Sequence, residues 1–211
     1  MTIVENYNKI SQTINTFKRE TKLIVVTKGQ DLSKIDPLIQ MGHHDFGENR
    51  VQEAKLKWEV FLSKNQDINL HFIGKLQSNK IKGIGELFKF IHSLDNIKNA
   101  DLLAKEEIRT SKKLKYFIQV NLAKEIQKSG IEEEQLSELI FYCKKVSLNV
   151  IGLMCIPPIN SDASVYFKRL KYLASNYSFN ELSMGMSDDY KDAISNGATY
   201  VRIGSLIFKE N

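Results

Sequence analysis

Short apolar runs alternate with amphipathic stretches along the whole chain, and this alternation constrains the fold more than any other feature. We expect an opening helix over about residues 3–20. The expected strands are Leu23–Thr27, Asp45–Gly47, Leu70–Ile73, Phe90–Leu94, Lys115–Asn121, Asn149–Ile156, Glu181–Met184 and Thr199–Ile203. Between them, helical patterns cover about 32–41, 49–63, 79–88, 96–110, 132–146, 162–176 and 188–196. Such repetition is typical of a parallel sheet covered by helices.

Strands separated in this way by helices predict an α/β fold, a single (β/α)8 TIM barrel with an extra N-terminal helix. The alternative is an open, doubly wound sheet, which favours a Gly-rich first turn after the first strand. That turn is Lys28-Gly29-Gln30-Asp31 and does not match GxGxxG. The chain has 211 residues, which is short for a barrel of about 250 residues. We therefore expect one domain over residues 1–211.

The stretch from 96 to 110 illustrates the helical pattern. Asn96 is a suitable N-cap, because its side chain can accept a hydrogen bond from the first turn. Ile97, Ala100, Ala104 and Ile108 follow at helical spacing and predict one apolar stripe facing the sheet.

Composition argues against several classes of function. The net charge is +5, but acidic residues lie among the lysines throughout, so we do not expect nucleic-acid binding. No apolar run is long enough to span a membrane, and the N-terminus lacks the pattern of an export signal. Cys143 and Cys155 are the two cysteines and form no CxxC motif. These features predict a reduced, cytoplasmic protein that does not bind membranes.

Lys28 stands where the first apolar strand stops. The C-terminal ends of barrel strands form one face, and this face carries the functional groups in such folds. An amine that loses its water in the barrel mouth is favoured in the neutral, nucleophilic form that reacts with aldehydes. The alternative for this residue taken alone is a lysine that leaves the strand for solvent.

The turns after the last two strands have the composition of a phosphate site. They read Ser183-Met-Gly-Met-Ser187 and Arg202-Ile-Gly-Ser205. In barrels these loops often bind phosphate through backbone N–H groups that glycines leave uncovered. Two tight turns with no ligand are the alternative. Together with Lys28, they predict a ligand that is both an aldehyde and a phosphate.

A series of motifs carries a family resemblance over nearly the whole chain. The motifs are Val26-Thr27-Lys28, Phe46-Gly-Glu-Asn49, His71-Phe-Ile-Gly74, Gln119-Val-Asn121 with Lys128-Ser-Gly130, Gly152-Leu-Met154, Leu182-Ser-Met-Gly-Met-Ser187 and Val201-Arg-Ile-Gly204. In this order, they resemble the pyridoxal-phosphate homeostasis proteins, which are related to the N-terminal barrel domain of alanine racemase.

The resemblance implies pyridoxal 5′-phosphate as the cofactor, held as a Schiff base on Lys28. Ser183, Gly204 and Ser205 fall at positions that hold the phosphate. Arg202 falls opposite the pyridine nitrogen and keeps that nitrogen unprotonated, which weakens the cofactor as an electron sink. The cofactor-binding residues implied are Lys28, Asn49, Met154, Ser183, Arg202, Gly204 and Ser205.

The resemblance further implies a protein of intracellular vitamin B6 homeostasis that does not turn over a substrate. The alternative is a pyridoxal-phosphate enzyme such as an amino-acid racemase. Racemisation needs acid–base groups on both faces of the reacting carbon, and in alanine racemase a second domain supplies one of them. We therefore favour a monomeric, non-catalytic binding protein. Its implied partners are pyridoxal phosphate, other B6 vitamers and apo-enzymes that use the cofactor.

Two further groups of residues have an ordinary structural interpretation. His43 and His44 are expected in an exposed loop, and His71 and His92 in the core, with no metal site at usual spacing. The basic segment from Asn79 to Lys82 is expected beside the mouth as a solvated helix start. Its alternative role is to attract a second anionic vitamer or an acceptor protein.

Overall fold

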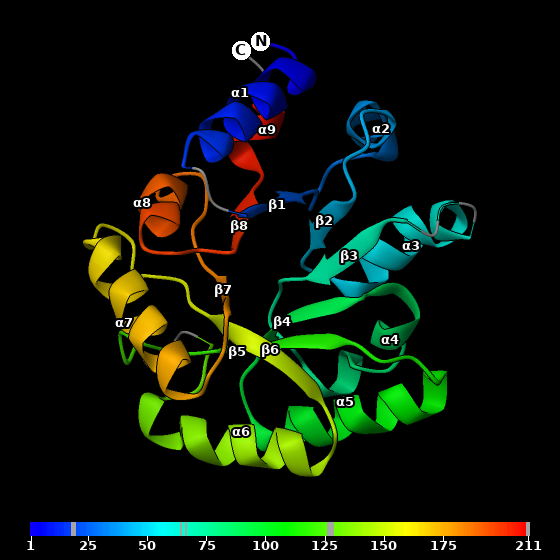
Figure 1. The fold of residues 1–211 in the computed structure, drawn as a ribbon. Coiled ribbons are helices and arrows are strands. Elements are labelled where there is room, and N and C mark those ends of the chain that lie inside the picture. Colours follow the sequence, from blue (N-terminus) through cyan, green and yellow to red (C-terminus); the bar gives the residue numbers. More distant parts are fainter. Residues whose placement is uncertain (18–19, 64, 66, 126–128, 210–211) are drawn as a thin grey trace.

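The strands of the computed structural model close into a barrel in chain order (Figure 1). They are β1 (Lys22–Val26), β2 (Asp45–Glu48), β3 (Asn69–Phe72), β4 (Phe90–Leu94), β5 (Lys115–Gln119), β6 (Asn149–Met154), β7 (Glu181–Ser183) and β8 (Tyr200–Ile203). The structure describes residues 1–17, 20–63, 65, 67–125 and 129–209. Every neighbouring pair is parallel, and β8 pairs with β1. The barrel prediction is confirmed, and the open sheet is excluded.

Helices surround the barrel and match most of the expected ranges. They are α1 (Ile3–Thr16), α2 (Leu32–Gln40), α3 (Val51–Leu62), α4 (Ile84–Leu87), α5 (Ile97–Thr110), α6 (Leu136–Lys145), α7 (Ala163–Asn176), α8 (Tyr190–Ser195) and α9 (Ser205–Phe208). Two 3₁₀ turns, Ser78–Lys80 and Glu133–Gln135, precede α4 and α6. The sequence did not predict α9. Of the residues discussed above, Lys128 and positions 18–19 of the opening helix lie outside the described residues.

The helix expected over 79–88 is wrong for most of its length. Its first part is the 3₁₀ turn, and Gly83 then adopts a φ of +90° before α4 begins. That backbone conformation suits glycine, and it breaks a continuous helix. The basic segment from Asn79 to Lys82 is consequently part of a turn instead of a helix.

The apolar stripe expected on α5 is only partly correct. Ala100 is fully buried, but Ile108 is 80% exposed. Glu107 is buried in its place, and its Oε1 accepts hydrogen bonds from the backbone N–H of Leu114 and the hydroxyl of Tyr116. A buried carboxylate that finds donors can therefore displace an apolar residue from the inner face of a helix.

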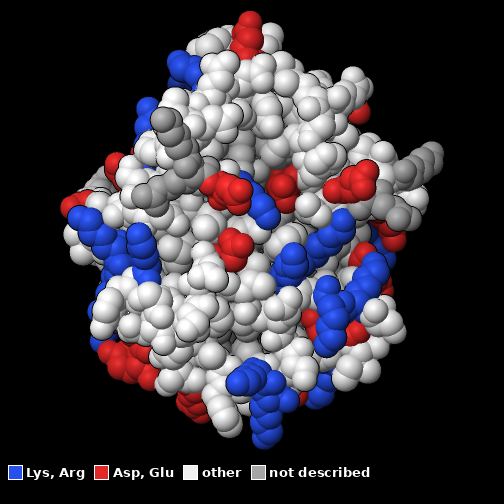
Figure 2. All heavy atoms as spheres, in the orientation of Figure 1, with Lys and Arg blue, Asp and Glu red and all other residues white. Residues whose placement is uncertain are grey.

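The surface carries charges of both signs. On the face shown in Figure 2, basic and acidic side chains are interspersed, and the lysines and arginines do not merge into one patch. Across the described ranges, no helix combines the length and apolar character needed to cross a bilayer.

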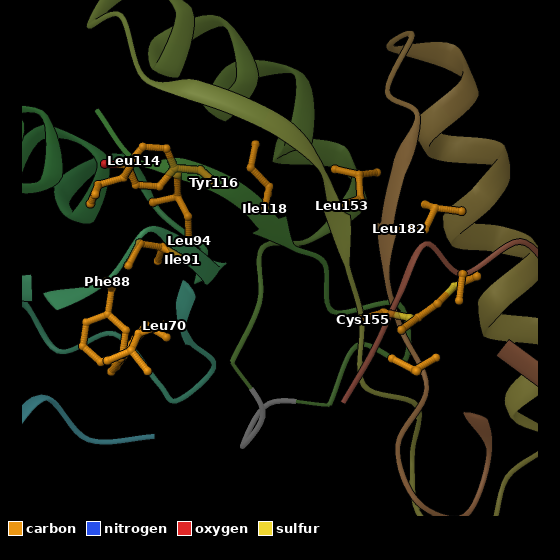
Figure 3. Packing of buried hydrophobic residues seen from close by; sticks show 14 of the residues in the cluster. Leu70, Phe88, Ile91, Leu94, Leu114, Tyr116, Ile118, Leu153, Cys155 and Leu182 are labelled. Carbon is orange, nitrogen blue, oxygen red and sulfur yellow. The ribbon is translucent and has the colours of Figure 1, made fainter. Parts of the chain in front are cut away.

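The buried apolar side chains form two clusters. The larger cluster fills the space between strands and helices, and Figure 3 shows Ile91, Leu94 and Tyr116 gathered in it. The smaller cluster contains Ile24, Phe90, Phe117, Met154 and Tyr200. Two buried histidines, His71 and His92, stack on phenylalanines of this cluster and belong to the same packed centre.

The N-terminal helix packs beside the last one. The α1 and α9 ribbons lie together in Figure 1. The buried Asn6 donates from Nδ2 to the backbone oxygen of Ile207 at 3.1 Å. The helix outside the barrel is thereby tied to the segment that follows β8.

His43 differs from the exposed loop residue that we expected. Its Nδ1 lies 3.1 Å from the hydroxyl of Tyr7, and its Nε2 lies 2.9 Å from the backbone oxygen of Asp45. Its ring also makes an edge contact with Phe46. His44, the next residue, is exposed as expected.

We predict that His43 makes the protein less stable in acid. Burial lowers the pKa of His43 to about 4, whereas an unfolded histidine has a pKa of about 6.5. Between these values the unfolded chain binds a proton that the folded chain does not. The part of the unfolding free energy that depends on neutral His43 is therefore fully present above pH of about 6.5. About 3 kcal/mol is lost as the pH falls to about 4. Urea unfolding across this range should show the loss in the wild-type protein, and the loss should be absent in His43→Gln. An unfolding free energy that depends on pH equally in the variant would contradict this assignment.

Candidate cofactor site

Lys28 lies two residues beyond β1, at the end of the barrel where the strands finish. Its side chain is exposed, which corrects the expectation that the amine loses its water in the barrel mouth. Its neighbours are held on both sides. The hydroxyl of Thr27 donates to Glu48 at 2.7 Å, and the backbone N–H of Gly29 donates to Glu53 at 2.7 Å. The side chain of Lys28 is thus exposed, while the backbone on both sides of it is anchored.

Glu48 organises the anchor behind Lys28. Its carboxylate is fully buried, and Oε1 accepts hydrogen bonds from Thr27, from Nζ of Lys57 at 2.8 Å and from Nε1 of Trp58 at 2.9 Å. Nζ of Lys57 also donates to the backbone oxygen of Thr27 at 2.7 Å. One buried ion pair therefore joins β2, helix α3 and the end of β1.

Arg202 is buried across the seam between β1 and β8. It pairs in register with Ile24, and only 4% of its surface is exposed. Nη1 donates to Oγ of Ser183 at 2.6 Å, and Nη2 donates to the backbone oxygen of Cys155 at 3.1 Å. Burial lowers the pKa of Arg202. Within the described ranges, its guanidinium makes no ion pair with a carboxylate. A buried cation in this condition suits a ligand that brings an acceptor.

The loops after β7 and β8 meet at Ser187 and Ser205. The hydroxyl of Ser205 donates to that of Ser187 at 2.8 Å; Ser205 is exposed and Ser187 is half-buried. Gly204 lies close to β1, since an added Cβ would come within 2.9 Å of the backbone oxygen of Val26. Close packing of the last strand on the first explains the glycine. Its exposure makes Ser205 available to an anionic group.

Ser183 lies at the end of β7 in a different setting. It is fully buried, and its Oγ contacts Nη1 of Arg202 and Nδ1 of His92. Its place at the phosphate stays a prediction, and the structure joins it to Arg202 instead of exposing it beside Ser205.

Asn49 lies between two hollows at the mouth. One, of about 520 Å³, is lined also by Arg50, Lys75 and Lys80. The other, of about 340 Å³, is lined also by Gln119 and Lys75. The Oδ1 atom of Asn49 is buried and has no hydrogen-bond partner among the described residues.

Met154 ends β6 and is fully buried in the interior cluster. It is in register with Gln119 on one side and Ser183 on the other. Its side chain therefore belongs to the packed floor below the mouth.

The predicted residues all lie at the C-terminal end of the barrel. Lys28, Ser205 and Gly204 belong to adjoining ends of β1 and β8, and Arg202 lies below them. An unpartnered amide oxygen, a buried guanidinium without a carboxylate and an exposed lysine fit a ligand that carries an aldehyde, a ring nitrogen and a phosphate. The role of Glu48 was not anticipated, although it stands within the motif Phe46-Gly-Glu-Asn49, and His92 was expected in the core but not in contact with Ser183. In the described part of the chain, no group of three or more potential ligands is placed to hold a metal ion.

Comparison with known proteins gives a consistent result. The sequence model of the alanine racemase N-terminal domain family matches residues 2–211. A pyridoxal phosphate homeostasis protein of Synechocystis is 38% identical over 208 residues, covering 94% of this chain and 95% of that protein. A protein of the same name from Haemophilus influenzae is 37% identical over 226 residues, covering 99% of this chain and 95% of that protein.

Solved structures agree with the sequence matches. PipY of Synechococcus elongatus, solved with pyridoxal phosphate bound, superimposes with a TM-score of 0.89 and 29% identity, covering 98% of this chain and all 100% of that one. Alanine racemase from Bartonella henselae has a TM-score of 0.76 at 15% identity, covering 99% of this chain and 58% of that one. The second likeness concerns the fold alone.

Proposed function

The chain belongs to the alanine racemase N-terminal domain family and, within it, to the pyridoxal phosphate homeostasis proteins, and from this we propose that it binds pyridoxal 5′-phosphate in intracellular vitamin B6 homeostasis. Lys28 would hold the cofactor as a Schiff base without substantial turnover. The observation that carries the proposal is that an exposed Lys28 follows β1, while the neighbouring strand β8 holds a buried Arg202 whose guanidinium makes no ion pair with a carboxylate among the described residues.

Each residue of the site has a proposed task. When bound, pyridoxal phosphate supplies an aldehyde and an electron-withdrawing ring. Arg202 would donate a hydrogen bond to the ring nitrogen, since a guanidinium has donors only and gives up no proton at ordinary pH. Ser205 and the backbone at Gly204 would hold the phosphate, and Asn49 and Met154 would line the ring. Ser183 would support Arg202 from below.

Arg202 also favours binding over catalysis. A ring nitrogen that stays unprotonated withdraws less charge, and so the site suits retention of the cofactor more than carbanion chemistry. Nearby Cys155 does not offer a second acid–base group, because burial raises the pKa of its thiol to about 12. We propose a non-catalytic binding protein, with a racemase as the alternative.

Several finer points belong to the same proposal. The chain would act as a single domain over residues 1–211 and as a monomer in the cytoplasm. Its partners would be other B6 vitamers and the apo-enzymes that receive the cofactor. The hollow lined by Arg50, Lys75 and Lys80 supports binding of a second anionic ligand at the mouth, because these three side chains are cationic.

We expect the protein mixed with pyridoxal phosphate to show the absorption of a protein-bound Schiff base and no enzymatic exchange. The complex would be incubated with each L-amino acid in deuterium oxide, and the deuterium at Cα followed by NMR. The control is free pyridoxal phosphate at the same concentration, which gives the slow background exchange. Stereospecific exchange at turnover rates typical of enzymes, of about 1 s⁻¹ or faster, would establish the racemase alternative instead.

A further inference from the structure

A chain of buried side chains crosses the inside of the barrel. It begins at Asp45, the first residue of β2, whose side chain is 22% exposed. Oδ1 of Asp45 lies 2.9 Å from Nε2 of His71, and Nδ1 of His71 lies 2.9 Å from Nε2 of His92. Nδ1 of His92 lies 2.8 Å from Oγ of Ser183, which accepts from Arg202 at 2.6 Å. The chain thus connects the base of the barrel with the guanidinium at the mouth.

With both imidazoles neutral and Asp45 ionised, one direction of hydrogen bonding satisfies every link of this chain. Arg202 can only donate, so Ser183 accepts there and its own hydroxyl proton is free for His92. Nδ1 of His92 then accepts, which leaves its proton on Nε2. That proton is donated to Nδ1 of His71, whose remaining proton on Nε2 is donated to Asp45. Every link is satisfied with both imidazoles neutral and with Asp45 ionised.

The reverse direction needs one more proton. If Nδ1 of His92 donated to Ser183, then His71 would have to donate from Nδ1 to His92. Its Nε2 would then face the Asp45 carboxylate without a proton unless His71 or Asp45 were protonated. The reverse chain is therefore one proton richer than the forward one.

Burial and neighbouring charges favour the forward chain. Burial lowers the pKa of His71 and, more strongly, that of His92, which also experiences the positive charge of Arg202. Burial alone would raise the pKa of Asp45, but the hydrogen bond from His71 helps to lower it below its usual range. Both histidines are then neutral and Asp45 is ionised at neutral pH.

The other titratable groups around the chain lie at its two ends. At the base, Lys22 donates to the hydroxyl of Tyr200 at 3.3 Å, and its charge, with that of Glu181, acts on this phenol. Lys22 also acts on His71, and His43 on Asp45. At the mouth, Cys155 and Asp189 act on Arg202. Between the ends, the neighbours are aromatic. The ring of His71 stacks on that of Phe90 with centroids 4.3 Å apart, and the ring of His92 stacks on that of Phe117 with centroids 4.4 Å apart.

We propose that Asp45, His71, His92 and Ser183 are positioning residues, which fix the buried guanidinium of Arg202 through a hydrogen-bonded chain of a single direction. The role of Arg202 toward the cofactor rests on the proposed function, whereas the chain itself does not. A consequence is that the hydroxyl proton of Ser183 is committed to His92. Ser183 then acts on the cofactor through Arg202, and the phosphate is left to Ser205 and backbone groups.

The first test is ¹⁵N NMR of the ligand-free protein, which has 4 histidines. We expect His71 and His92 to be neutral Nε2–H tautomers at neutral pH, with exposed His44 as the solvent-exchanging reference signal. A proton on Nδ1 of either buried ring, or a positive charge on either, would overturn the proposed direction. This measurement needs neither a variant nor the cofactor, so its result is independent of whether the protein binds pyridoxal phosphate.

The second test breaks the chain at chosen links. Ser183→Ala removes the donor to His92 and should change the His92 signal. It should also weaken pyridoxal phosphate binding on the order of tenfold and shift the ¹⁵N resonance of the bound ring. Ser93→Ala is the matched control, since Ser93 is a buried serine on β4 whose Oγ has no partner among the described residues. Asp45→Asn keeps an acceptor oxygen and should preserve the His71 tautomer, whereas Asp45→Leu should not. Wild-type histidine signals and ring resonance in Ser183→Ala would refute the positioning role.

Discussion

Replacing Lys28 with alanine is expected to abolish covalent attachment of pyridoxal phosphate. Lys28 is exposed at the end of β1, between a Thr27 held by Glu48 and a Gly29 held by Glu53. An anchored backbone with a free amine is what a lysine needs to reach a carbonyl group at the mouth. Borohydride reduction followed by peptide mass analysis should place the label on Lys28 in the wild-type protein and find none there in the variant.

The control for this experiment is Lys75→Ala. Lys75 is also exposed, and it lines both hollows beside Asn49. Its removal tests whether any lysine near the mouth is sufficient, and we expect the label on Lys28 to persist. Residual non-covalent binding by Lys28→Ala is compatible with the assignment, because Arg202 and Ser205 remain. A variant that still carries reducible cofactor at this site would show that another amine forms the bond.

Replacing Glu48 with alanine is expected to cost about 3–5 kcal/mol of unfolding free energy. The carboxylate of Glu48 is fully buried, and its partner Lys57 is 10% exposed. Removal of Glu48 leaves the ammonium of Lys57 with only the longer, 4.0 Å pair to Glu53. It also takes the acceptor from the Trp58 indole N–H and leaves the Thr27 hydroxyl only the 3.3 Å contact with the backbone oxygen of Gly47. Urea denaturation at neutral pH measures the loss.

The same helix offers a matched control. Lys55 and Glu59 on α3 form an ion pair with side chains 51% and 59% exposed. Such a pair contributes roughly 0–1 kcal/mol, so Glu59→Ala should be nearly silent. Because Glu48 also fixes Thr27, we expect Glu48→Ala to reduce labelling of Lys28 as well. Equal losses of unfolding free energy in Glu48→Ala and Glu59→Ala would mean that the buried pair contributes no more to stability than the exposed one.

The fold could be predicted because it depends on local pattern. The strand Phe90–Leu94 agrees with the sequence at both ends, since an apolar run is bounded there by polar residues. The predicted strand Asn149–Ile156 extends two residues too far, because the polypeptide leaves the sheet after Met154. The expected helix over 79–88 was wrong because Gly83 interrupts it, an effect of backbone conformation that an apolar pattern does not contain.

The candidate site, like the fold, could be predicted from the sequence only in part. Lys28 and Arg202 could be placed, because the end of a barrel strand identifies the functional face whatever the partners are. Their environments could not be predicted. The exposure of Lys28 and the burial of Arg202 depend on neighbours from other strands. A histidine inside a strand has the same sequence pattern whether it fills space or joins a chain, so the link between His71 and His92 became visible only in the assembled barrel.

The closure of β8 onto β1 sets a time order for the site during synthesis. Ile24 and Arg202 are neighbours in the sheet, but they come from opposite ends of the chain. A ribosome releases Lys28 early, long before the strand that completes its surroundings has been translated. The proposed binding site for the cofactor aldehyde is therefore complete only once β8 has been synthesised and has paired with β1. On the proposed assignment, attachment of the cofactor is consequently a step that follows translation, since an unfinished chain exposes Lys28 before Arg202 and Ser205 are in place beside it.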